Sequence, residues 1–198
     1  MKAPRLIKAS AGLLFSLLAA APISALDFHL REHRIRNLDG DSFDFYFAHQ
    51  ERKLFYRPPW SWTWQDSTEE FVARPPLPSR GRLVLQAMKP YPELPAPGTT
   101  EGLEAYRKHF ANTLPPGSSN GEEVECIVEK IGGRELPATR GTFNYEWGGR
   151  ARGQTIIYAA FRPDLWLVIR IDSLKEDFEK VKRIALASLE GLSEGVQK

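Results

Sequence analysis

Apolar and polar residues alternate with a period of two through the second half of the chain, and turn residues stand at each break in the alternation. This period is typical of β-strands that bury one face. It predicts four consecutive strands, which lie around Val124–Val128, Thr139–Trp147, Gln154–Arg162 and Leu165–Ile171. Short connections between strands favour antiparallel pairing. We therefore expect an antiparallel meander.

Two segments have the three- and four-residue spacing of a helix with one apolar face. The first runs from Glu101 to about Leu114, where Pro115-Pro116-Gly117 ends it. The second follows Ser173, and its apolar stripe extends to Leu192. Ser173 and Glu176 have the spacing of a capping box, in which each side chain accepts a backbone N–H of the other residue, so we expect Ser173 to begin this helix.

The first half predicts fewer elements. Asp41–Phe47 alternates like a strand, and Arg82–Met88 forms a second strand that stops at Pro90. An extended stretch is expected after Pro58-Pro59. Four prolines between Lys89 and Thr100 remove too many amide donors for a helix or a central strand, so we expect a surface crossover there. The fold class is therefore α+β: an antiparallel sheet packed with two main helices.

The first 25 residues have the order of a cleavable signal peptide. A basic head precedes an apolar run that ends in small residues, with cleavage expected after Ala25 and with Ala21 as the second candidate. We divide the chain into a signal peptide (1–25), a solvated basic N-terminal segment (26–40), one α+β domain (41–193) and a frayed C-terminus (194–198). The product is expected to be periplasmic or secreted, without stable membrane insertion.

The composition argues against several partner classes. Removal of residues 1–25 leaves 24 basic against 25 acidic residues, a net charge of −1. The surface as a whole then has no positive potential that would attract phosphates, so no nucleic-acid partner is expected. The single cysteine, Cys126, has no partner for an internal disulfide. A chain of this size buries enough surface for one core, and we expect a monomer without a cofactor.

The order of elements resembles the PsbP-like fold, an antiparallel sheet packed between helices. Stretches such as Lys130-Ile131-Gly132-Gly133-Arg134 and Tyr158-Ala159-Ala160-Phe161 are similar to those of this family. The resemblance covers about Asp41 to Leu192 and implies an α+β sandwich. Members of the fold are mostly binding or assembly proteins, so the resemblance also implies a protein that is not an enzyme.

Trp60, Trp62 and Trp64 stand at a spacing of two, which places all three rings on one side of an extended chain. Together they would form a patch as large as the largest on typical monomers. The rings therefore belong to the core or form a site. We expect the core, because a sheet face under a helix is often aromatic; the alternative is a platform for a partner or a sugar ring.

His29 and His33 have the spacing that places two imidazoles on one face of a helix, with Asp39 and Asp41 as nearby oxygen donors. Two histidines alone do not make a zinc site, and the segment is equally compatible with a strand. The pair lacks the glutamate placement of a metalloprotease helix. We therefore expect no metal, and His29 and His33 are the weak candidates if one binds.

Cys126 and His109 form the one cysteine-based nucleophile pair that the sequence offers. Val124 and Val128 flank the cysteine on the predicted apolar face of a strand. A thiol in such a place is usually a small core residue with a raised pKa. We expect an inert thiol and assign no catalytic residue.

Gly148 to Gly153 contains Arg150 and Arg152 and connects two predicted strands. It is expected to be a wide, mobile and cationic hairpin loop. Such a loop can hold an anionic ligand or an acidic protein surface. It matches no phosphate-loop fingerprint, because strands flank it on both sides.

These observations favour an exported, non-enzymatic binding or accessory protein of the cell envelope, whose partner is a protein or a small ligand. An immunity protein that blocks a toxin is one form of this function. The candidate binding residues are Trp60, Trp62, Trp64, Arg150 and Arg152. The alternative is a periplasmic hydrolase acting on envelope material, which requires polar side chains that converge in one cleft.

Overall fold

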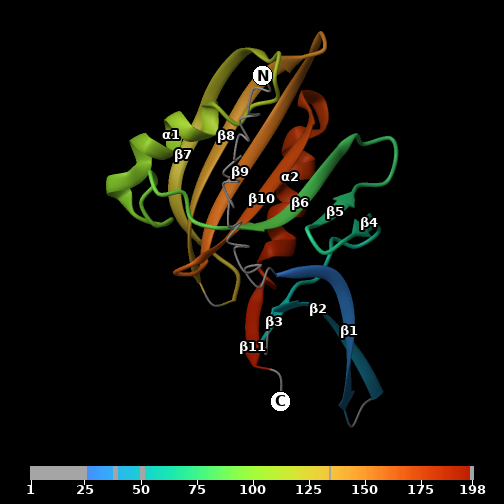
Figure 1. Cartoon of the computed structure of the whole chain (residues 1–198). Helices are drawn as coiled ribbons and strands as arrows, with labels where there is room; N and C mark the ends of the chain where they lie inside the picture. Colours follow the sequence, from blue (N-terminus) through green and yellow to red (C-terminus); the bar gives the residue numbers. More distant parts are fainter. Residues whose placement is uncertain (1–25, 38–39, 50–51, 134, 197–198) are drawn as a thin grey trace, which may run out of the picture.

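The computed structural model describes residues 26–37, 40–49, 52–133 and 135–196. The predicted signal peptide and both of its cleavage positions, Ala21 and Ala25, lie outside the described residues. The same holds for Asp39, Arg134 and residues 197–198. The described part of the chain forms two antiparallel sheets and two α-helices, which confirms the α+β class (Figure 1).

The large sheet has the strand order β4-β5-β6-β10-β9-β8-β7, and its neighbouring strands are antiparallel. Strands β7 to β10 form the predicted meander, with Tyr158 of β9 opposite Thr139 on one side and Val168 on the other. The bounds of these strands are β4 (Thr63–Asp66), β5 (Glu70–Arg74), β6 (Gly81–Met88), β7 (Ser119–Ile131), β8 (Leu136–Trp147), β9 (Arg150–Arg162) and β10 (Leu165–Leu174).

The two helices pack on opposite faces of this sheet (Figure 1). Helix α1 (Leu103–Ala111) follows a short 3-10 turn, η1 (Thr100–Gly102), and α2 (Lys175–Leu189) follows β10. Successive strand residues point to opposite faces, so Tyr158 packs in the cluster under α1 whereas Ile157 packs in the cluster under α2. Neither helix in the described ranges combines the length and the apolarity that crossing a membrane requires.

A small second sheet corrects the prediction for both ends of the chain. It has the order β1-β2-β3-β11, from β1 (Asp27–Asn37), β2 (Gly40–His49), β3 (Arg52–Phe55) and β11 (Ser193–Val196). Residues 26–37 are therefore not a solvated segment: Leu26 and Phe28 are buried, and the Phe28 ring lies 5.1 Å from that of Phe47. Residues 194–196, which were predicted to be frayed, belong to β11 and pair with β3.

The predicted capping box at Ser173 is wrong. Ser173 is still part of β10, where it pairs with Gly81 on one side and Gly153 on the other. Its hydroxyl donates to the carbonyl of Leu174, and α2 begins at Lys175 without a side-chain cap. Strand pairing on both sides holds Ser173 in extended geometry, and this pairing prevails over the local preference for a cap.

Candidate partner-binding surface

The three tryptophans do not share a face. Trp60 and Ser61 form a turn in which the amide of Trp62 donates to the carbonyl of Pro59. The φ of Ser61 is 66°, and this value interrupts the extended geometry on which the alternation depends. The exposed fraction is 95% for Trp60, 4% for Trp62 and 46% for Trp64. Trp62 thus lies in the core, whereas the expectation of a core position is wrong for Trp60 and Trp64.

The loop that carries Trp60 is held at both ends by buried aromatic side chains. Tyr56 begins the loop, stacks on Phe47 at 5.7 Å, and forms a hydrogen bond of 3.2 Å with the hydroxyl of Ser188 on α2. Burial raises the pKa of Tyr56 above its ordinary value, so its phenol stays neutral. Trp62 ends the loop in the core. Since prolines 58 and 59 also restrict the backbone, the loop displays Trp60 on a stiff support.

A second loop, residues 75–80, displays another apolar side chain beside Trp60. Leu77 is 86% exposed and lies among three prolines. The carboxylate of Asp177 on α2 accepts the backbone N–H of Arg80 at 3.0 Å and so holds this loop against the helix. Trp60 and Leu77 line the same hollow of about 260 Å³, together with Ile184 of α2. Trp60 also borders a larger hollow of about 770 Å³.

We call these neighbouring apolar residues the Trp60 surface; its members are Pro58, Pro59, Trp60, Pro76, Leu77 and Ile184. Polar groups lie along its edge, where Arg57 donates to Asp44 at 3.1 Å. An apolar centre with a polar rim is the common anatomy of a protein interface. Tryptophan is among the residues that contribute most to binding in such places. The surface can therefore receive apolar groups of a partner.

The cationic loop is smaller than predicted. Gly148 and Gly149, with φ values of 59° and 71°, form a tight turn, and β9 begins at Arg150. Two residues with positive φ suit a two-residue hairpin, which explains why the wide loop is absent here. Arg152 lies inside the strand and donates to Asp172 at 2.8 Å; Arg82 binds the same carboxylate. Of the two predicted arginines, Arg150 alone is an exposed, unpaired cation in the described chain.

His29 and His33 lie on strand β1, so the helical geometry considered for a metal pair is wrong. Four residues span about 13 Å along a strand, too far for two imidazoles to share one ion. His29 pairs with Asp27 at 2.7 Å, and the His33 ring packs near Tyr46 and Phe55. Among the described residues, no group of three histidine, cysteine, aspartate or glutamate side chains has the geometry for a metal ion.

Cys126 and His109 have separate partners. His109 on α1 forms a hydrogen bond of 3.0 Å with the phenol of Tyr158, and burial lowers its pKa. Cys126 on β7 lies 4.0 Å from the carbonyl of Leu103, and no hydrogen bond among the described residues joins it to His109. Val124 is exposed, because the pairing of β7 with β8 shifts register between Glu123 and Glu125. The cysteine therefore has a core position and no base.

We expect the Cys126 thiol to react slowly with a disulfide reagent in the folded protein. Burial raises its pKa to about 11, and each pH unit below that value lowers the thiolate fraction about tenfold. Modification by an aromatic disulfide at pH 7.5, followed by absorbance, should therefore be at least about 100-fold slower than in urea-unfolded protein. Fast modification of the folded protein would contradict both the burial and the raised pKa.

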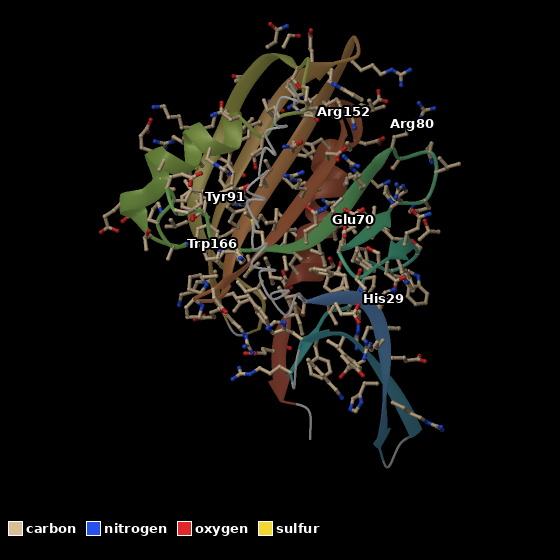
Figure 2. All side chains as sticks on the ribbon, in the orientation of Figure 1. His29, Glu70, Arg80, Tyr91, Arg152 and Trp166 are labelled. Atoms are coloured by element: carbon tan, nitrogen blue, oxygen red, sulfur yellow. The ribbon has the colours of Figure 1, made fainter. Side chains whose placement is uncertain are left out.

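A further hollow of about 420 Å³ lies on the α1 side of the large sheet, and it tests the hydrolase alternative. Tyr91, Tyr158 and Arg170 line it, and Glu69 is the one carboxylate among its described lining residues. Tyr91 lies near the base of α1 in Figure 2, on the opposite side of the sheet from α2. Hydrolysis by a carboxylate pair needs two converging carboxyl groups. This lining does not provide them.

The geometry defines an α+β domain with a helix on each face of an antiparallel sheet and an apolar surface on two stiff loops. No family model and no curated protein sequence matches the chain. Among solved structures, LpqN of Mycobacterium tuberculosis, described as involved in cell envelope biogenesis, is 16% identical with a TM-score of 0.53. The match covers 84% of this chain and 91% of LpqN.

Two other solved structures are similar at lower scores. Cyanobacterial PsbP from Synechocystis is 12% identical with a TM-score of 0.46, over 95% of this chain and 98% of that one. A Pseudomonas aeruginosa protein of unknown function, described as a putative regulator, is 14% identical with a TM-score of 0.48, over 82% and 96%. The similarity to LpqN, which has the PsbP-like fold, confirms the predicted fold, and at 16% identity it shows the fold alone.

Proposed function

We propose that the chain is an exported, non-enzymatic binding or accessory protein of the cell envelope that holds a protein partner at the Trp60 surface. The observation that carries this proposal is the 95% exposure of Trp60 beside Leu77, which is 86% exposed. Water around two neighbouring, largely exposed apolar side chains is released when a partner covers them. Export rests on the signal-peptide order of the first 25 residues.

A protein partner fits this surface better than a small polar ligand does. The rigid support of Trp60 lowers the entropy lost on binding, since Tyr56 and Trp62 already fix the loop. The two hollows that Trp60 borders offer places for two apolar side chains of one partner. LpqN, which shares the fold, is described as involved in cell envelope biogenesis. A toxin bound by an immunity protein is one partner of this kind.

The test is site-specific photo-cross-linking in cells, with the cross-linking residue at position 60 and, as a matched control, at position 64. Trp64 is also an exposed tryptophan, but it lies on the edge strand β4, outside the Trp60 surface. We expect a defined envelope protein to be captured from position 60 and not from position 64. Equal capture from both positions would contradict the proposal.

With the captured partner in hand, Trp60→Ala and Leu77→Ala should each weaken binding. Loss of a central tryptophan contact costs about 2 kcal/mol, which is about 30-fold in Kd. Trp64→Ala should leave Kd within about twofold. Titration calorimetry with the purified pair measures these values, and an unchanged Kd for Trp60→Ala would place the partner on another surface.

A further inference from the structure

The described chain has a second distinctive surface where three elements meet at one end of the large sheet. A hollow of about 780 Å³ lies between the loop before β6, the start of β9 and the start of α2. Figure 2 shows Arg80 and Arg152 at this same end, far from His29. The described residues that line the hollow are Pro78, Arg80, Arg150, Ala151, Leu174, Lys175 and Glu176.

The lining has an excess of positive charge. Arg80, Arg150 and Lys175 contribute three cations, against the single carboxylate of Glu176. In the part of the chain that the structure describes, the guanidinium groups of Arg80 and Arg150 form no ion pair, whereas those of Arg52, Arg57, Arg82, Arg107, Arg140, Arg152 and Arg162 do. Lys175 donates to the neutral amide of Asn144. Glu176 offsets one of the three cations, so the described lining keeps a net positive charge.

Contacts near Arg80 and Arg150 fix the backbone at these residues and leave their guanidinium groups without an ion pair among the described residues. Asp177 accepts the backbone N–H of Arg80, so it fixes the loop while the guanidinium group stays available. The tight turn at Gly148-Gly149 fixes Arg150 at the first position of β9. Asp172 binds both Arg82 and Arg152, and this triad has a net charge of +1. The backbone that carries Arg80 and Arg150 is thus fixed before any ligand binds.

We infer that this hollow binds a phosphoryl group. A phosphate monoester has three acceptor oxygens and a charge of about −1.5 to −2, which suits three cationic donors from three elements. Guanidinium groups bind such oxygens in pairs, so Arg80 and Arg150 would hold two edges of the group while Lys175 acts as a point charge. A carboxylate offers two oxygens and one charge and fits less well. The inference stands independently of the Trp60 surface.

The test compares the wild-type protein with the double variant Arg80→Gln/Arg150→Gln. Arg183→Gln is the matched control, since Arg183 is exposed, unpaired among the described residues and located elsewhere on α2. Inorganic phosphate is titrated into each protein and followed by NMR chemical shifts. Vesicles of phosphatidic acid and phosphatidylethanolamine, in which phosphatidic acid carries a phosphate monoester, are tested by co-sedimentation, and a hexaglutamate peptide is titrated as a carboxylate probe. Circular dichroism without ligand checks that all three proteins fold alike.

We expect wild type and Arg183→Gln to bind a phosphoryl probe and the double variant to bind it at least tenfold more weakly. Binding should also weaken as sodium chloride rises, because exposed charges are screened. Binding of inorganic phosphate identifies a free phosphoryl ligand, and binding of vesicles alone identifies a lipid headgroup; both support the inference. Equal binding by wild type and the double variant, or binding of hexaglutamate alone, overturns it.

Discussion

Replacing Trp62 with alanine should lower the free energy of unfolding by about 3–5 kcal/mol. Trp62 is 4% exposed and belongs to the cluster between the large sheet and α2. Its removal leaves a cavity lined by side chains that strand pairing and the helix hold in place. Trp60→Ala should change the free energy of unfolding by less than about 0.5 kcal/mol, because Trp60 is 95% exposed.

Urea unfolding of the two variants, followed by circular dichroism, measures this contrast. Trp64→Ala is a useful third variant, since its ring is half exposed on edge strand β4. We expect its cost to lie between those of Trp60→Ala and Trp62→Ala. Similar losses for Trp60→Ala and Trp62→Ala would mean that Trp60 also supports the fold, and the Trp60 surface would then lose its main evidence.

The sequence predicted the meander well, because the alternation of apolar and polar residues within each strand indicates which face of that strand is buried. Strands β7 to β10 pair with sequence neighbours, so a pattern within one segment was sufficient. In the small sheet, the strand Asp41–Phe47 was predicted and is part of β2, but the pairing of β3 with β11 was missed for the opposite reason. Strand β3 has four residues, and its partner β11 lies at the far end of the chain, where Arg52 meets Glu194. No local pattern reports such a distant pairing.

The candidate surfaces were predicted in part. Trp60 and Arg150 were singled out by residue type, but their neighbours Leu77 and Arg80 were not. Those two lie in a loop rich in proline, which has no hydrophobic period to interpret. The turn at Ser61 was also missed, because a positive φ at serine has no sequence signature of its own. Contacts with α2 hold both loops, through Ser188 and Asp177.

Gly153→Val should destabilise the protein by about 3 kcal/mol, at the upper end for an overpacked core. Gly153 lies on the α2 face of β9, and a Cβ atom there would overlap with the ring of Phe178. Phe178 is in the first turn of α2 and is 1% exposed, so the ring has no free space to enter. Gly191→Ala is the control, since the nearest atom to its added Cβ lies at 3.9 Å.

A double-mutant cycle shows whether Gly153 matters through Phe178 or through the backbone. Phe178→Ala alone should cost about 3–5 kcal/mol, because it empties the space over the sheet. If Gly153 is required because the ring of Phe178 occupies the place of a Cβ atom, valine fills part of the space that Phe178→Ala leaves. The loss in free energy of unfolding for Gly153→Val/Phe178→Ala should then be smaller than the sum of the two single losses by at least about 1 kcal/mol. Additive losses in urea unfolding would instead assign the cost to strand geometry, and the close approach of α2 to β9 would need another cause.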